Sequence, residues 1–348
     1  MAIQNYGLNA GRINKFKGEI LAHAVPVEVL GITGQNKKMP RNNGDTVVYR
    51  RYIPYGASNT NANTQNRMSI TAAAHITTEG VTPTADTITP VDVSVQLQQY
   101  ACLYAVSDKT VDMYEDDIPM EMKQQTGERM GLVREMIRYG QLKACTNAFY
   151  SGGTSRTTVV GKITLPLLRK VARNLLSNHG KLITSILAPS ANFNTAPVEA
   201  GYLVFCHTDA ETDIRDLPGF VHVSEYGQRK VVHEMELGSA DRFRFIVSPE
   251  LAAYADAGGA VAGTGLYSTT GTSLDVYPMI VVAQDAWGDV ALRGMDSVDP
   301  TWIPPGQKDK NDPLGQRGYV GAKFYSAATV LNAGWMAVVE VGVDDLNH

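Results

Sequence analysis

Residues 46–107 constrain the fold more than any other part of this sequence. Thr46–Tyr55 and Val91–Val106 have the composition of strands, and the second begins with a strict alternation of apolar and polar residues. Between them, Gly56–Arg67 is rich in asparagine and Thr77–Pro90 is rich in threonine and proline. Such a polar middle cannot bury enough apolar surface to order itself, and a two-stranded excursion is marginal alone. We therefore expect a projecting hairpin that lies on a neighbouring copy of the chain.

Two helices are predicted downstream of this hairpin. Asp116 or Asp117 can cap the first helix, which should extend to about Phe149. The second helix should span about Thr164–Asn178 and end before Gly180.

Three glycines interrupt the first predicted helix: Gly127, Gly131 and Gly140. Each weakens a helix by up to ~1 kcal/mol relative to alanine. We interpret them as positions where something packs closely against the helix.

The remaining sequence predicts an arm and a mixed domain. Apolar residues at helical spacing over Arg12–Ala24 predict a short amphipathic helix that docks elsewhere as an arm. Residues 183–295 alternate short apolar runs with polar turns, and Thr208–Glu211 has the pattern of a capping box. Apolar strands return over Tyr319–Val343. Together these elements predict an α+β fold.

The composition is that of a globular protein with a nearly balanced charge. Apolar residues make up 44% of the chain, and 31 Lys and Arg against 35 Asp and Glu give a net charge of −4. A dedicated nucleic-acid binder is normally basic. The first residues lack the apolar core of a signal peptide, and no stretch approaches the roughly 18 apolar residues of a membrane-spanning helix. We therefore expect a protein that is made in the cytoplasm and has no membrane partner.

The three cysteines, Cys102, Cys145 and Cys206, are far apart and lie in apolar stretches. A disulfide framework or a zinc site would favour an even number or close spacing. We interpret them as buried free thiols of a reducing compartment.

Catalytic motifs are incomplete. The Gly263–Gly265 pair lacks the third glycine of a dinucleotide fingerprint, and Gly161–Lys162 lacks the Ser or Thr that follows in a P-loop. His233–Glu234 lacks the second histidine of a zinc protease. The sequence therefore predicts no enzyme and no cofactor.

Four residues could in principle gather around a metal ion: His207, Asp209, His222 and His233. Histidines beside apolar residues are more often packed or hydrogen-bonded, and a metal site needs several donors in one geometry. We therefore favour ordinary histidines and expect no metal.

Tyr49–Tyr52 combines two arginines with two aromatic rings, a composition that could contact nucleic acid. In a strand, however, Arg50 and Arg51 point to opposite faces, so they form no basic patch. We favour contacts with acidic residues of a neighbouring subunit. The residues we expect at such contacts lie at the base and tip of the hairpin: Arg50, Arg51, Asn59, Asn63 and Arg67.

The order of arm, extended loop, long helix, α/β domain and returning strands is similar to the Hong Kong 97 coat fold of tailed bacteriophages. Several local segments sharpen this likeness, and each resembles the coat-protein branch typified by coliphage N4. These segments are Lys38–Tyr52, His207–Asp209, Asp213–Phe220, Glu225–Gly227, Glu234–Gly238 and Arg242–Pro249.

The resemblance implies a major capsid protein that assembles as hexamers and pentamers into an icosahedral shell around packaged double-stranded DNA. Scaffolding, portal and decoration proteins would be its partners, first in the host cytoplasm and then in the virion. It also implies five regions. They are an N-arm (1–45), an extended loop (46–107), a spine helix with peripheral domain (108–159), an axial domain (160–295) and a return to the peripheral domain (296–348).

One property of some relatives is not expected here. They join neighbouring subunits through a lysine in the extended loop, but no lysine occurs from residue 39 to 108. We therefore predict a non-covalent shell. The alternatives are an encapsulin, which resembles the same fold but encloses a cargo enzyme, and a soluble α/β enzyme, against which the missing motifs argue.

Arg134 and Arg138 are four residues apart on the long helix, a spacing at which like charges repel mildly. Either Glu135 and other carboxylates offset them, or they face a polyanion inside the shell. We favour the first interpretation and retain genome contact as a hypothesis.

Overall fold

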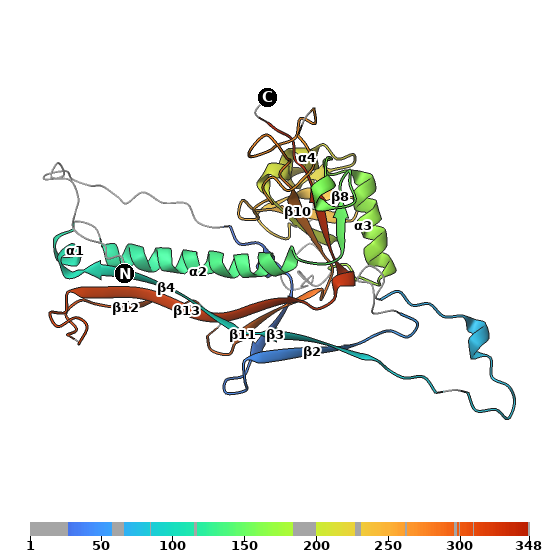
Figure 1. Ribbon diagram of the computed structural model, residues 1–348, viewed down its shortest axis with the longest axis horizontal. Coiled ribbons are helices and arrows are strands. Elements are labelled where there is room, and N and C mark those ends of the chain that lie inside the picture. The colour runs from blue at the N-terminus through green and yellow to red at the C-terminus, as the bar shows by residue number, and fades with distance from the viewer. Residues whose placement is uncertain are drawn as a thin grey trace.

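The computed structural model of the chain describes residues 27–57, 66–83, 85–114, 117–183, 200–226, 231–261, 263–295, 298, 300–308 and 310–346. The helix expected at Arg12–Ala24 lies outside these residues. Figure 1 shows a long helix beside an extended sheet, a compact domain at one end of the helix, and a two-stranded ribbon that continues into a projecting loop.

The long helix is α2, Ile118–Leu142, and it follows the short helix α1, Asp108–Met113. Asp117 caps it, since its side chain accepts from the backbone N–H of Met120 over 3.2 Å. The helix ends at Leu142 and not at Phe149, because residues 148–150 form strand β5 (Ala148–Tyr150) beside the C-terminal strand β14. Strand pairing in the compact domain therefore overrides local helix propensity.

The extended sheet lies under α2 and has five strands. They are β1 (Gln35–Met39), β4 (Gln98–Ser107), β11 (Trp287–Leu292), β12 (Thr301–Ile303) and β13 (Arg317–Val330). The order is β1-β11-β13-β12, and β4 pairs antiparallel with β13 along ten residues. Met130 of α2 packs on Ala322 and Phe324 of β13, which fixes the helix on this sheet.

The compact domain contains a seven-stranded sheet of order β5-β14-β10-β6-β9-β8-β7. Its other strands are β6 (Tyr202–Cys206), β7 (Val221–His222), β8 (Glu236–Ala240), β9 (Phe243–Val247), β10 (Tyr277–Val282) and β14 (Met336–Val341). Helix α3, Leu165–Ser177, packs on it through Leu168, Val171 and Leu175, which are fully buried. The prediction of this helix was correct to within one residue at each end.

Two strands lie in a different sheet from the one that their position in the sequence suggested. β14 runs between β5 and β10 in the compact domain, although the sequence grouped it with β13. β11 lies in the extended sheet, although the sequence placed it in the 160–295 region. All six residues of β14 are buried, so this strand forms part of the compact core.

The ribbon consists of β2, Thr46–Tyr52, and β3, Pro90–Gln96, paired antiparallel from Thr46–Gln96 to Tyr52–Pro90. The expected hairpin is therefore present. Its predicted second strand was too long, because the chain leaves the ribbon after Gln96 and Gln98–Ser107 pairs with β13 instead. The loop between β2 and β3 carries one 3-10 helix, η3 (Ala72–His75).

The cysteines are free thiols, as expected. Cys145 and Cys206 are buried, and burial raises the pKa of the Cys145 thiol to about 11. Cys102 is only half-buried, which corrects the prediction for that residue.

Candidate assembly surfaces

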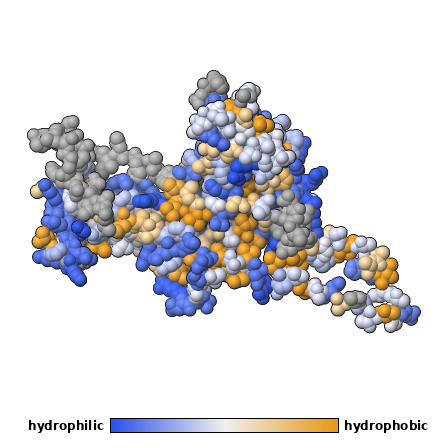
Figure 2. All heavy atoms as spheres, viewed as in Figure 1, coloured by the Kyte–Doolittle hydropathy of each residue, from blue (hydrophilic) through white to orange (hydrophobic). Residues whose placement is uncertain are grey.

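The projecting loop exposes large apolar side chains. Ile76 is 78% exposed and Ile88 is 77% exposed, and neither has a core of its own chain to pack against. Among the described residues of this loop, the other exposed large apolar side chains are Tyr55, Met68, Ile70 and Val81. Figure 2 shows apolar atoms near the far end of this arm. Single exposed apolar residues are ordinary, but a concentration of them on one segment marks an interaction site.

A groove with a volume of about 650 Å³ lies on the extended sheet. Leu103 of β4 and Ile303 of β12 line it and are 53% and 42% exposed. Gly321 of β13 lies in its floor, where a Cβ atom would come within 2.9 Å of the Leu103 side chain. Since neighbouring residues of a strand point to opposite faces, this groove lies on the side of the sheet away from α2.

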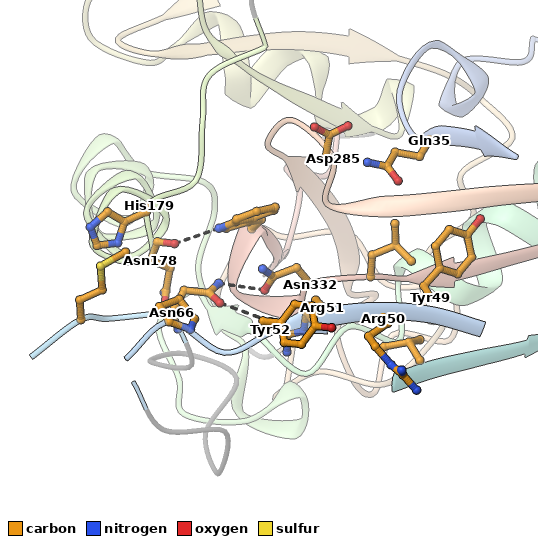
Figure 3. A pocket seen from close by; sticks show the side chains of 15 residues that line it. Gln35, Tyr49, Arg50, Arg51, Tyr52, Asn66, Asn178, His179, Asp285 and Asn332 are labelled. Carbon is orange, nitrogen blue, oxygen red and sulfur yellow. Dashed lines mark hydrogen bonds between the residues drawn. The ribbon is translucent and has the colours of Figure 1, made fainter. Parts of the chain in front are cut away.

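A second pocket, with a volume of about 490 Å³, lies where the ribbon meets the compact domain (Figure 3). Asn66, in the loop between β2 and β3, is buried here. Its side chain donates to Oδ1 of Asn332 over 2.9 Å and accepts from Arg51 over 3.3 Å. Its backbone N–H donates to Oδ1 of Asn178 over 3.4 Å, and the Asn178 carbonyl accepts from Trp335 over 2.9 Å. The loop is therefore anchored to the compact domain at Asn66.

Tyr49 lines the same pocket with a buried hydroxyl that has no hydrogen-bond partner among the described residues. Burial, with the nearby charge of Asp289, raises the pKa of this hydroxyl. The ammonium group of Lys37 lies 4.9 Å from the centre of the Tyr49 ring. A cation–π contact and a buried hydroxyl thus lie on the Tyr49 side of the pocket.

Arg50 and Arg51 lie on opposite faces of β2, as predicted. Arg50 is exposed and makes a bidentate pair with Asp92 of β3, with N–O distances of 2.7 and 2.8 Å. This pair raises the pKa of Arg50, whereas burial lowers the pKa of Arg51. Both guanidinium groups therefore have partners within the chain, and no neighbouring subunit is needed to explain them.

The sequence assigned the other predicted contact residues to the tip of the hairpin, but Asn66, next to Arg67, is bonded to the compact domain. Arg67 is exposed, directly after the buried Asn66. Asn59 and Asn63 lie outside the described residues.

Arg134 and Arg138 of α2 turn toward their own chain. The guanidinium of Arg138 donates to Asp289 of β11 over 3.0 and 2.6 Å and lies 3.5 Å from Glu135. The Arg138 side chain is only 11% exposed. Two carboxylates therefore offset the charge of Arg138 inside the fold, which is the interpretation that the sequence favoured. Arg134 stacks on Phe324, with 4.7 Å between the guanidinium carbon and the ring centre.

Glu135, which the sequence suggested only as an offset for the arginines, is also a buried anchor. Its fully buried carboxylate accepts the backbone N–H groups of Val29 and Leu30 over 2.8 and 2.7 Å, and burial raises the pKa of this carboxyl. Residues 29 and 30 lead into a 3-10 helix, η2 (Leu30–Ile32), which is thereby held against α2.

The glycines of α2 gave a partial signal for this contact. A Cβ at Gly131 would collide with the side chain of Glu28, so close packing at this position is confirmed. The same interpretation is wrong for Gly127 and Gly140, where an added Cβ would meet nothing within 4 Å.

No group of three His, Cys, Asp or Glu residues that could hold a metal ion occurs among the described residues. Within that same part of the chain, none of the helices has the length and apolar character required to cross a membrane.

The fold is the one found in solved phage capsids. The capsid structure of Ralstonia phage GP4 superimposes with a TM-score of 0.67 at 10% identity, covering 100% of both chains. The head structure of Helicobacter pylori bacteriophage KHP40 gives 0.58 at 11% identity, over 99% of this chain and 98% of that one. These similarities in three dimensions establish the architecture.

Among characterised sequences, the chain is similar to a major capsid protein of Pseudomonas phage KPP21. The two are 22% identical over 250 residues, which cover 67% of this chain and 61% of that protein. The similarity therefore spans less than two thirds of the relative's length. No family model matches the chain.

Proposed function

We propose that this chain is the major capsid protein of a tailed bacteriophage, with a Hong Kong 97 fold of the branch typified by coliphage N4. The likeness to phage capsids along the whole chain supports the fold. The similarity to a phage major capsid protein supports the role, which is structural and not enzymatic. The segments Lys38–Tyr52 and Asp213–Phe220 support the branch.

The observation that carries this proposal is the apolar surface of the projecting loop. Ile76 and Ile88 are almost fully exposed on an arm that extends away from the core (Figure 1). Burying such side chains is worth roughly 25 cal/mol per Å² of apolar area, so an arm of this kind is stable when a second surface covers it. In a closed shell, many weak contacts of this kind add up to a persistent assembly.

The acceptor that we propose is the groove on the extended sheet of a neighbouring copy. Leu103 and Ile303 give it apolar walls, and Gly321 leaves its floor open. Arg50, Asn59, Asn63 and Arg67 would add polar contacts around it. Arg51, which faces its own pocket, would hold the ribbon in position for this contact.

Hexamers and pentamers of the chain would form an icosahedral shell around double-stranded DNA, without covalent cross-links. The proposed regions are the N-arm, extended loop, spine helix, peripheral domain and axial domain, with β14 contributing to the axial sheet. Scaffolding, portal and decoration proteins would join during assembly in the host cytoplasm. Arg134 is the remaining candidate for a non-specific genome contact.

An encapsulin shell and a soluble α/β enzyme are less well supported. The solved structures compared above are phage capsids. The incomplete catalytic motifs also give the enzyme interpretation no candidate chemistry.

The proposal is tested by size-exclusion chromatography of the purified protein, with negative-stain electron microscopy of every peak. The measurement is made with and without a scaffolding protein from the same phage. We expect capsomer rings, sheets or closed shells in at least one condition. A monomer at every concentration in both conditions contradicts the proposal.

A further inference from the structure

Charge is distributed unevenly along this chain. The longest stretch without an acidic residue is 136–198, which contains no Asp or Glu and eight Lys or Arg. Of the 31 basic residues of the chain, 23 therefore remain elsewhere, against all 35 acidic residues. A net charge of −4 thus combines a basic segment with an acidic remainder, and such an asymmetry affects how surfaces associate.

Carboxylates of the chain offset part of this basic charge. Arg138, Arg156 and Lys162 each lie within 2.6 Å of a carboxylate oxygen. A fourth cation, Arg169, lies 3.5 Å from Asp241, and its side chain is 64% exposed, so this pair adds little. The other four have no carboxylate partner among the described residues: Lys143, Lys170, Arg173 and Lys181.

Helix α3 carries the centre of the basic surface. Lys170 and Arg173 are exposed on it three residues apart, and Arg169 is exposed four residues before Arg173. Like charges at these spacings repel. Yet α3 contains no Asp or Glu, not even in its first turn, where the helix dipole favours them. The helix alone would be more stable with acidic residues on this face, which indicates a partner that supplies negative charge.

The basic face of α3 lies next to the projecting loop. Asn178, the C-cap of α3, accepts the backbone N–H of Asn66 over 3.4 Å, so the loop passes the C-terminal end of the helix. Leu176, which is 43% exposed, and Lys181 lie at the same end. Figure 1 shows α3 and the projecting loop on the same side of the compact domain. A copy of the chain that covers the loop is therefore placed beside α3.

Charge favours a second copy over nucleic acid as the partner of this face. Outside 136–198 the acidic residues exceed the basic ones by twelve, so the remainder of a second copy offers an excess of carboxylates. A nucleic acid would instead have to approach a chain that is itself negative overall.

We infer that the exposed face of α3, formed by Arg169, Lys170 and Arg173, binds an acidic surface of the neighbouring copy that covers the projecting loop. This inference rests on the proposed function, because it requires that copies of the chain assemble. Opposite charges across an interface fix orientation and speed encounter more than they add affinity. The α3 face therefore directs docking, while the loop supplies the apolar contact.

Charge reversal in Lys170→Glu with Arg173→Glu tests this contact. Both side chains are exposed, so the variant should fold with an unchanged unfolding midpoint. At about 0.1 M NaCl, in the condition where the wild type assembles, we expect roughly 10-fold fewer capsomers and shells by chromatography and electron microscopy, because like charges across an interface repel. Raising the salt to about 1 M shortens the Debye length from about 10 Å to about 3 Å and should remove most of this difference.

Two further variants separate charge from other effects. Lys170→Arg with Arg173→Lys keeps both charges and should assemble as the wild type does. Lys308→Glu with Lys310→Glu makes the same change of charge at exposed positions between β12 and β13, and it should also assemble as the wild type does.

The outcomes distinguish this inference from the proposed function. If the wild type assembles and the reversed α3 variant assembles as well as the Lys308 and Lys310 control, only this inference is overturned. If the wild type assembles in no condition, the proposed function and this inference are both overturned. Binding of a short fluorescein-labelled DNA duplex is measured with the same variants. A reversed α3 variant that assembles normally but loses duplex binding would show that α3 faces nucleic acid, which also overturns the inference.

Discussion

Asn66 donates to the side-chain oxygen of Asn332 over 2.9 Å, joining the extended loop to the turn between β13 and β14. That turn is the 3-10 helix η7, Ala333–Trp335, whose Gly334 N–H also donates to Asn332 Oδ1, over 3.1 Å. The buried amide of Asn332 therefore holds both the turn and the loop at Asn66. The loop leaves the body in a defined direction although it has no core of its own.

Replacing Asn66 with alanine removes this anchor and leaves buried polar groups unpaired. An unpaired buried group costs about 1–3 kcal/mol. We expect Asn66→Ala to make residues 66–89 much more sensitive to limited proteolysis and to lower the unfolding midpoint. Asn36→Ala, at an exposed position of β1, is the control. Equal cleavage rates in the two variants would contradict the anchor.

Glu135 gives a pH-dependent prediction. Because burial raises the pKa of its carboxyl, the folded state binds this proton more tightly than the unfolded state does. The contribution of Glu135 to stability must therefore fall as the pH rises through its raised pKa. We expect the difference in unfolding free energy between the wild type and Glu135→Gln to shrink from about pH 4 to about pH 7.

Urea unfolding at several pH values measures this difference. Glu79→Gln changes one exposed carboxyl in the projecting loop in the same way and serves as the control. A difference for Glu135→Gln that grows with pH would show that the Val29 and Leu30 amides favour the ionised form more than burial opposes it.

Two glycines should respond in opposite directions to alanine. At Gly127 an added Cβ meets nothing within 4 Å, so Gly127→Ala should stabilise α2 by about 0.5–1 kcal/mol. Gly34 has a φ of +102°, and a Cβ there would come within 2.7 Å of the Trp287 ring. Gly34→Ala should therefore destabilise the chain by about 1–3 kcal/mol. Thermal unfolding of both variants checks the signs, and two changes of the same sign would contradict the packing.

Much of the fold could be predicted from local sequence. The alternation in β3, the cap and first turn of α2, and the apolar face of α3 are local signals, and each element formed where its signal lay. The end of α2 was missed because Phe149 pairs with β14, which lies almost 190 residues further along the chain. The division of strands between the two sheets was missed for the same reason, since pairing partners far apart in sequence leave no local pattern.

The candidate surfaces were less predictable than the elements that carry them. The strand pattern predicted that Arg50 and Arg51 would point to opposite faces of the ribbon. No sequence pattern could show that Asp92 would bind Arg50 or that Asn66 would bind Arg51. Similarly, Glu135 lies one residue after Arg134 on an ordinary helical stripe. Its role depends on the backbone of Val29 and Leu30, more than 100 residues away in the sequence.

The Arg50–Asp92 pair separates a contact within the chain from one between copies. Arg50→Glu should weaken the ribbon through repulsion with Asp92, and Arg50→Glu with Asp92→Arg should restore the pair. If Arg50 also binds a neighbouring copy, the charge-swapped variant will regain protease resistance in the ribbon but not assembly. Electron microscopy of the swapped variant distinguishes the two roles, and full recovery of assembly would confine Arg50 to its own chain.

The apolar face of the projecting loop gives the sharpest test of the capsid proposal. Ile76 and Ile88 are 78% and 77% exposed, so Ile76→Asp with Ile88→Asp should leave the unfolding midpoint of the isolated chain unchanged. In an assembly, the same change would bury two charges in an apolar groove, which is strongly unfavourable. We therefore expect folded protein that forms no shells. Thr77→Asp with Thr87→Asp adds the same charge to polar positions of the same segment and should assemble more readily. Shells of normal yield from the isoleucine variant would show that this surface stays exposed in the assembly.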